Sequence, residues 1–210
     1  MYDTAEEPAT RPAADPVDLA AHYARKTLNA PVYDVAIQTP LSPAPRLSRQ
    51  LGCEVLLKRE DLQPVYSFKL RGAYNRVMQL SPAERARGVI AASAGNHAQG
   101  LALAAKKLDI EATIVMPRTA PELKVQGVLS HGARALLHGD AFPEALAHAQ
   151  ALAREQGLVF IPPYDDPDVI AGQSPTGSPD RHSHWPHALA ALAGEGLLDR
   201  AALVDACAAR

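Results

Sequence analysis

The sequence predicts an α/β fold in which helices connect the strands of a parallel sheet. Between residues 88 and 161, four short apolar runs alternate with three longer segments whose apolar residues recur at helical spacing. Strands that alternate with helices imply right-handed crossovers and parallel pairing. Hydrophobic residues make up 47% of the 210 positions and charged residues 21%, which supplies enough apolar material for a buried core.

Before residue 88, proline and polar residues separate the expected elements. In chain order these are a disordered lead-in over 1–20, a helix over 19–28, an extended stretch over 31–45, a strand over 55–57 and a helix over 68–80. Ser67 is expected to cap the last of these helices. Ser81 and Pro82 are expected to end it.

After residue 88, turn residues and helix stop signals set the expected boundaries. The expected strands cover 88–93, 112–116, 134–138 and 159–161. The expected helices cover 97–108, 121–132 and 141–156. Asp140 is expected to cap the helix over 141–156, with Phe142 and Ala149 on its inner face and Gly157 as its stop.

Charge and hydropathy exclude several classes of protein. Lys and Arg number 21 against 23 Asp and Glu, a net charge of −2, so we expect no nucleic acid or membrane partner. No apolar run reaches the roughly 18 residues of a membrane-spanning helix. The first residues lack the features of a signal peptide. The two cysteines, Cys53 and Cys207, match no metal-ligand spacing and are typical of a reduced, cytoplasmic protein.

The segment from Ser67 to Gly72 places a lysine at the start of a predicted helix. In the first turn, the positive end of the helix dipole disfavours an ammonium on Lys69, and Arg71 adds further positive charge. Both effects favour the neutral amine, which is the form that a Schiff-base nucleophile requires. The alternative is a solvated lysine on an exposed turn, which six residues alone would favour.

The segment from Ser93 to Gly100 follows a predicted strand and opens a predicted helix. Small residues such as Gly95 let a ligand approach the backbone, and free N–H groups at a helix start favour a carboxylate or phosphate. Asn96 supplies an amide that donates and accepts, which suits a phenolic oxygen. The alternatives are an ordinary turn with a left-handed Asn and a core position for His97.

A third motif, His182, His184 and His187, has a spacing that could bind a metal weakly. Because no cysteine or carboxylate cluster completes a site, we interpret this stretch as a polar segment and expect no metal.

Together, in this order and strand–helix context, the first two motifs resemble threonine dehydratase, a family of pyridoxal-phosphate enzymes with the tryptophan-synthase-β fold. The resemblance covers about 150 of the 210 positions, between residues 22 and 173. Its segments are 30–33, 39–41, 58–64, 67–74, 93–100, 115–117, 162–165 and 169–173. The N-terminal segments are more similar to the biosynthetic form, which feeds isoleucine synthesis, than to the catabolic one.

The resemblance implies a role for each matching residue. Lys69 would hold pyridoxal phosphate as an internal aldimine, Phe68 would lie beside its ring, and Asn96 would bind its phenolic oxygen. The substrate carboxylate would be held by Ser93, Ala94, Gly95 and backbone N–H groups near His97. Threonine would displace Lys69, and the freed amine would take the Cα proton. Loss of the β-hydroxyl and hydrolysis would then give 2-oxobutanoate and ammonia.

The resemblance also implies two domains and a shortened chain. We expect a nearly complete smaller domain over 89–165, a partial cofactor-binding larger domain over 21–88 and 166–173, and an unrelated tail over 174–210. The family's glycine-rich phosphate cup, the partner of its pyridine nitrogen and its C-terminal allosteric domain have no counterpart here. A truncated or frame-shifted enzyme with exposed apolar faces and open strand edges is therefore expected.

The resemblance thus implies a lyase that deaminates L-threonine and that forms a homo-oligomer in the full-length family. Two alternatives stay open. One is serine dehydratase or serine racemase activity, and the other is a non-catalytic remnant of the enzyme.

Overall fold

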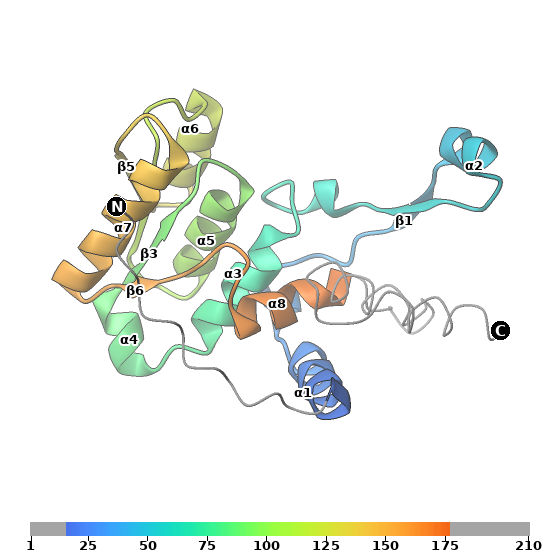
Figure 1. Cartoon of the computed structure of the whole chain (residues 1–210), viewed down its shortest axis with the longest axis horizontal. Helices are drawn as coiled ribbons and strands as arrows, with labels where there is room; N and C mark the ends of the chain where they lie inside the picture. The colour runs from blue at the N-terminus through green and yellow to red at the C-terminus, as the bar shows by residue number, and fades with distance from the viewer. Residues whose placement is uncertain (1–15, 177–210) are drawn as a thin grey trace, which may run out of the picture.

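A four-stranded parallel sheet organises the fold (Figure 1). The structure is a computed structural model that describes residues 16–176. The strands are β3 (Val89–Ala92), β4 (Ala112–Met116), β5 (Arg134–Leu137) and β6 (Val159–Phe160). They lie in the order β5-β4-β3-β6, and every neighbouring pair is parallel. This confirms the predicted α/β class, and each strand falls inside the run that predicted it.

Alternate residues of the strands face opposite layers of the molecule. In β3, Ala91 packs in one apolar cluster with Ile114 of β4, whereas Ile90 packs in a second cluster with Val115. This alternation follows from the two-residue repeat of a strand. Both faces of the sheet are therefore buried, as is usual for parallel sheets covered by helices.

Helices supply the covering layers on both faces. On one face, α5 (Asn96–Lys107) and α6 (Glu122–Ser130) contribute Leu101 and Val128 to the first cluster. On the other, α7 (Phe142–Gln156) contributes Ala145 and Ala149 to the second. The sheet is thus the middle layer of three.

The start of α7 differs from the prediction. Its N-cap is Ala141 and not Asp140. The backbone N–H of Asp140 instead donates to the Glu144 carboxylate at 2.6 Å, so the first turn is capped from within the helix. Phe142 is 40% exposed, because the inward face of α7 starts at Ala145, three residues later.

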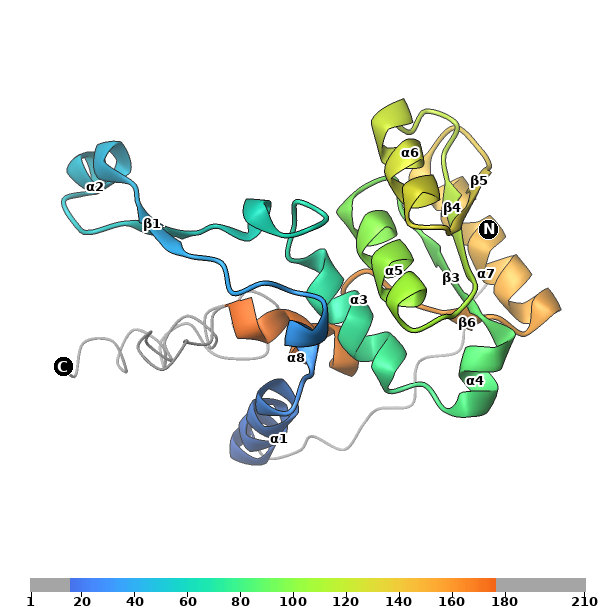
Figure 2. The same cartoon turned by 180° about the vertical axis from the view of Figure 1, so that it is seen from behind.

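Helix α3 (Lys69–Met78) packs between α5 and α8 (Pro167–Gln173), and glycines permit both contacts (Figure 2). A Cβ atom on Gly100 of α5 would lie 2.9 Å from the backbone nitrogen of Leu70 in α3. On the opposite side, a Cβ atom on Gly172 of α8 would lie 2.9 Å from the Cα of Gly72. The backbone of α3 is therefore held closely from two sides.

The N-terminal helix of the described chain lies next to α8. Helix α1 (Pro16–Leu28) packs against α8. Residues 16–20 belong to α1, so they are helical and not part of the lead-in that the sequence predicts over 1–20. Pro16 is the first residue of this helix, a position that suits proline. Residues 1–15 lie outside the described part of the chain.

An arm extends from the body of the molecule (Figure 1). It consists of β1 (Leu41–Pro43), α2 (Pro45–Leu51) and β2 (Leu56–Lys58). Along the chain, a short 3₁₀ helix precedes the arm, η1 (Val32–Asp34), and another follows it, η2 (Glu60–Leu62). Strands β1 and β2 pair antiparallel. The side chains of Leu41, Leu56 and Leu57 are exposed on the arm, in line with the exposed apolar faces that the sequence predicts.

Helix α4 (Pro82–Arg87) begins where the sequence predicted only the end of a helix. The hydroxyl of Ser81 accepts a hydrogen bond from the N–H of Glu84, whose carboxylate accepts one from the N–H of Ser81. Ser81 and Pro82 therefore start α4, whereas α3 already ends at Met78 with Gln79 as its C-cap, before the stop that the sequence predicted. A final 3₁₀ turn, η3 (Ser174–Thr176), closes the described chain, in which no helix is both long and apolar enough to cross a membrane.

Candidate active site

The carboxyl ends of β3 and β6 form the switch point of the sheet. From β3 the chain passes through α5 to β4 and onward to β5, whereas β6 returns to the opposite side of β3. In open parallel sheets, ligands bind in the crevice where the strand order reverses in this way. Here the segment from Ser93 to Asn96 leaves β3, and the segment from Ile161 to Pro163 leaves β6.

Lys69 reaches this switch point from α3. Its Nζ atom donates a hydrogen bond to the carbonyl oxygen of Pro163 at 2.8 Å. The ring of Phe68 lies beside the amine, with its centroid 5.2 Å from Nζ. Lys69 is the first residue of α3, which begins one residue later than predicted, so the lysine lies in the first turn as expected, at the positive end of the helix.

Ser67 differs from its predicted role. The N-cap position of α3 is Phe68, which makes no side-chain capping bond. The hydroxyl of Ser67 nevertheless accepts a hydrogen bond from the backbone N–H of Lys69 at 3.0 Å. Ser67 thus stabilises the same helix start from one position earlier than a standard N-cap.

The loop after β3 is organised by Ser93. Its hydroxyl accepts hydrogen bonds from the backbone N–H groups of Gly95 at 3.2 Å and Ala98 at 3.3 Å. Ala94 and Gly95 are half-buried, and nothing lies within 4 Å of the position that a Cβ on Gly95 would take. The first N–H groups of α5 have no acceptor inside their own helix, so this open loop can accommodate a carboxylate.

Asn96 is the first residue of α5, and its side chain is oriented by α6. Its Oδ1 atom accepts a hydrogen bond from Nζ of Lys124 at 2.9 Å. Because the oxygen is engaged, the amide NH₂ is the group that remains to donate to a ligand. Lys124 was not singled out in the sequence, because nothing in its local pattern distinguishes it from other lysines on helices.

His97 is buried, with a relative exposure of 3%. Its Nε2 atom lies 3.1 Å from the carbonyl oxygen of Ile161, which can only accept, so Nε2 carries the proton. Burial lowers the pKa of His97 to about 4, with a further contribution from the charge of Lys69 and an opposing one from the bond to Ile161. The ring is therefore neutral at physiological pH.

The structure brings the two sequence motifs together around the segment after β6. Lys69 and His97 donate to carbonyl oxygens only two residues apart, those of Pro163 and Ile161. Sequence reasoning missed both acceptors, because a backbone carbonyl has no residue-specific signature. The histidine motif at 182–187 and Cys207 lie outside the described residues. Within 16–176, no group of three metal-ligating side chains occurs.

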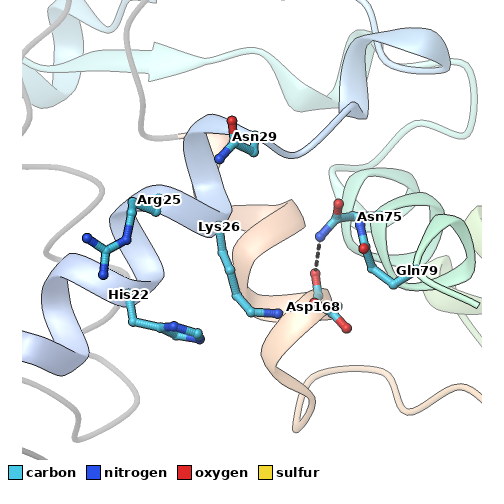
Figure 3. A pocket seen from close by; sticks show the side chains of 7 residues that line it. All are labelled: His22, Arg25, Lys26, Asn29, Asn75, Gln79 and Asp168. Atoms are coloured by element: carbon cyan, nitrogen blue, oxygen red, sulfur yellow. Dashed lines mark hydrogen bonds and ion pairs between the residues drawn. The ribbon is translucent and has the colours of Figure 1, made fainter.

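A separate polar pocket lies between α1, α3 and α8 (Figure 3). Its lining residues are His22, Arg25, Lys26, Asn29, Asn75, Gln79 and Asp168, none of which is a predicted site residue. The amide of Asn75 donates to the backbone carbonyl of Asp168 at 2.7 Å, and Lys26 pairs with the Asp168 carboxylate. These bonds join the three helices, so we interpret the pocket as a structural junction.

The fold and the residues at this switch point define a class: α/β proteins that present a lysine amine at the switch point of a parallel sheet. The chain belongs to the family of pyridoxal-phosphate dependent enzymes, which matches residues 32–178. It is 56% identical over 158 residues to a biosynthetic, chloroplastic threonine dehydratase of Arabidopsis thaliana. It is 55% identical over 153 residues to a biosynthetic L-threonine dehydratase of Pasteurella multocida.

Solved structures show the same likeness. The processed form of threonine deaminase isoform 2 from Solanum lycopersicum matches with a TM-score of 0.75 and 49% identity, over 80% of this chain and 46% of that one. Maize serine racemase matches with a TM-score of 0.69 and 29% identity, over 74% of this chain and 47% of that one. The match to the Arabidopsis protein covers 75% of this chain and 27% of that protein, and the match to the Pasteurella protein covers 73% and 30%. The chain thus spans under a third of the length of these two relatives.

The residues at the switch point fit the reactive end of the family's cofactor. Pyridoxal phosphate carries an aldehyde, for which Lys69 supplies a primary amine, and an aromatic ring, beside which Phe68 can lie. Its phenolic oxygen requires a donor, which the amide of Asn96 retains. The buried Nδ1 atom of His97 has no hydrogen-bond partner among the described residues, so it is an acceptor that the fold itself leaves unsatisfied.

Proposed function

We propose that this chain carries the lysine and the substrate-carboxylate loop of a threonine ammonia-lyase, which converts L-threonine to 2-oxobutanoate and ammonia. The observation that carries the proposal is the amine of Lys69 at the switch point, bonded to Pro163 and set beside the loop that starts at Ser93. Identities of 55–56% to proteins named threonine dehydratase support the choice of substrate.

In this proposal Lys69 both anchors the cofactor and moves the proton. When bound, pyridoxal phosphate supplies an aldehyde that joins a primary amine and a ring that withdraws electrons from the amino-acid Cα. The Nζ atom of Lys69 takes the Cα proton as a general base. Its hydrogen bond to the Pro163 carbonyl would hold Nζ on one side of the bound substrate, so the proton is removed from one face.

The loop after β3 orients the substrate. The backbone N–H of Ala94 and free N–H groups at the start of α5 bind the carboxylate, and Gly95 leaves room for it. Ser93 keeps that loop in shape by accepting from the N–H groups of Gly95 and Ala98. Asn96 donates its amide to the phenolic oxygen, while Lys124 holds the amide oxygen. Because burial lowers the pKa of His97 to about 4, its ring is neutral and only weakly basic, and abstraction of the Cα proton is left to Lys69.

We propose residues 89–165 as the smaller domain, since the whole parallel sheet lies within it. We also propose an amino acid as the partner and the cytoplasm as the location. Serine dehydratase or racemase activity is the second candidate, and the likeness to maize serine racemase favours it at lower identity, 29%.

Two measurements test the proposal. The purified chain is incubated with pyridoxal phosphate and reduced with borohydride, and the modified lysine is located by peptide mass spectrometry. Release of 2-oxobutanoate from L-threonine, and of pyruvate from L-serine, is measured in parallel. Lys69→Met is compared with Lys107→Met, which removes an exposed lysine from the end of α5.

The expected result is modification at Lys69 and formation of 2-oxobutanoate, both lost in Lys69→Met and kept in Lys107→Met. Pyruvate from serine without 2-oxobutanoate from threonine would favour the second candidate. Modification at Lys69 without either product would indicate a non-catalytic remnant. Random modification of surface lysines, with Lys69 no more reactive than Lys107, would refute the proposed site.

A further inference from the structure

A buried ion pair between Arg71 and Glu60 involves the first turn of α3, the turn that also carries Lys69. Arg71 is fully buried, and Glu60 is only 9% exposed. The guanidinium donates to the Glu60 carboxylate through Nε at 2.8 Å and through Nη2 at 3.0 Å. A bidentate pair of this kind constrains direction as well as distance, because two parallel hydrogen bonds share one plane.

Further hydrogen bonds fix the carboxylate of Glu60 itself. The hydroxyl of Thr39 donates to Oε1 at 2.5 Å, and the amide of Gln63 donates to both carboxylate oxygens, at 3.2 and 3.1 Å. Burial alone would raise the pKa of Glu60, but the hydrogen bonds from Arg71 and Thr39 and the charge of Arg71 outweigh it and lower that pKa. Glu60 is therefore a carboxylate at neutral pH.

Gln63 and Arg71 also bind the backbone of Ile37, in the segment before the arm. The amide of Gln63 donates to the carbonyl oxygen of Ile37 at 2.8 Å, and its oxygen accepts from the N–H of Ile37 at 2.9 Å. Arg71 also donates to that carbonyl, at 3.2 Å. The cluster of Thr39, Glu60, Gln63 and Arg71 thus joins α3 to two separate stretches of chain.

The position of Arg71 relates this cluster to Lys69. The two residues are two apart on α3, so their side chains leave the helix about 200° apart around its axis. On one side the first turn is bonded to Glu60, and on the other it is bonded to Pro163. A rotation of the turn that moved the amine of Lys69 would have to break the planar pair between Arg71 and Glu60.

We propose that Glu60 is a positioning residue, which acts through Arg71 to fix the rotation of the first turn of α3 and hence the direction of the Lys69 amine. This inference rests on the proposed role of Lys69 in binding the cofactor. Stability alone does not explain the pair, because well-packed apolar residues often serve as well as a buried ion pair. What apolar residues would not supply is a fixed direction for the neighbouring lysine.

The test uses Glu60→Gln, which keeps the shape of the side chain and removes its charge. The matched control is Asp61→Asn, which removes the adjacent carboxylate from an exposed pair with Arg59. Two labels report on Lys69 in the full chain. Reductive methylation by formaldehyde measures the accessibility of the Lys69 amine to a small reagent. Borohydride trapping of pyridoxal phosphate measures how readily the amine reaches the orientation that joins the cofactor aldehyde.

In Glu60→Gln we expect methylation of Lys69 to rise and trapping of pyridoxal phosphate on Lys69 to fall by about tenfold, the effect of weakening one charge-assisted hydrogen-bonded pair. Asp61→Asn should label as the wild type does. Loosening of the whole fold would raise both labels, so the opposite directions separate positioning from structure. Circular dichroism checks that each variant is folded.

Other outcomes are equally informative. If folded Glu60→Gln gives both labels at wild-type rates, or raises both, the inference is wrong. If Glu60→Gln does not fold, Thr39→Val removes a single bond to Glu60, and the same opposite changes, smaller in size, are expected; unchanged labelling there overturns the inference. Failure of the wild type to trap pyridoxal phosphate on Lys69 would refute the proposed function, whereas methylation would still report on the positioning.

Discussion

The Nζ atom of Lys69 lies 2.8 Å from the carbonyl oxygen of Pro163, a residue 94 positions further along the chain. The bond joins the start of α3 to the segment that leaves the edge strand β6. It therefore places the amine at the switch point of the sheet, where the loop from Ser93 to Asn96 also begins. A lysine on an ordinary exposed turn would have no such partner.

Replacing Lys69 by methionine should separate function from stability. The side chain is half-buried, and a single hydrogen bond contributes only about 0.5–1.5 kcal/mol net. The free energy of unfolding of the cofactor-free chain, measured with urea, is therefore expected to fall by about 1 kcal/mol or less. Modification by pyridoxal phosphate at this position should vanish. A loss of several kcal/mol would mean that Lys69 is chiefly a structural residue.

Gly100→Ala should disturb the packing of α5 against the start of α3. The added Cβ would lie 2.9 Å from the carbonyl carbon of Lys69 and from the nitrogen of Leu70, which are backbone atoms that cannot move aside singly. We expect a loss of about 1–3 kcal/mol in the free energy of unfolding from overpacking, although alanine itself favours a helix. Reductive trapping at Lys69 should weaken as α3 shifts.

Gly127→Ala in α6 is the control for this substitution. It makes the same change inside a helix, but the atoms that its Cβ would meet belong to the side chain of Gln99, which can move. We expect its free energy of unfolding to stay within about 1 kcal/mol of the wild type. Equal losses in the two variants would show that contact with the α3 backbone is not what matters at Gly100.

Much of the fold could be predicted because its strands are short, apolar and bounded by turns. The run 112–116 is observed as β4 with the same ends, and the alternation of strands and helices correctly implied a parallel sheet. The position of Lys69 at a helix start, and of Asn96 where β3 turns into α5, also followed from local pattern. These features depend on residues close together in sequence.

What could not be predicted depends on contacts between distant residues. The order β5-β4-β3-β6 is set by which helix covers which face of the sheet. The bonds from Lys69 and His97 go to backbone carbonyls, which any residue type provides. Glu60 and Arg71 are charged residue types, which are usually found at the surface. In the structure both are buried, and they form an ion pair with each other.

Ser93→Ala should destabilise the start of α5. The hydroxyl accepts from the N–H groups of Gly95 and Ala98, and loss of such a capping side chain costs about 1 kcal/mol. The free energy of unfolding should fall by that amount in urea titrations. Ser130→Ala, which removes an exposed hydroxyl at the end of α6, should stay within about 0.5 kcal/mol of the wild type. Equal losses in the two variants would argue against the capping role.

His97 should make the chain less stable in mild acid. Its pKa is lowered to about 4 in the folded chain, first by burial and then by the charge of Lys69, against 6.5 for an exposed histidine. His97 therefore binds a proton more readily in the unfolded chain than in the folded one. Its contribution to the free energy of unfolding is complete above pH 6.5 and is lost as the pH falls towards 4. The free energy of unfolding should drop by about 2 kcal/mol between pH 7 and pH 5 from this residue alone.

His97→Gln isolates that contribution. A glutamine amide can still donate to the carbonyl of Ile161, but it does not titrate. Urea unfolding of both proteins at pH 7, 6 and 5 should therefore give a smaller decline for the variant, by about 2 kcal/mol over the range. Parallel declines in the two proteins would show that His97 is protonated as easily when folded as when unfolded. The neutral ring that leaves proton transfer at Cα to Lys69 would then have no support.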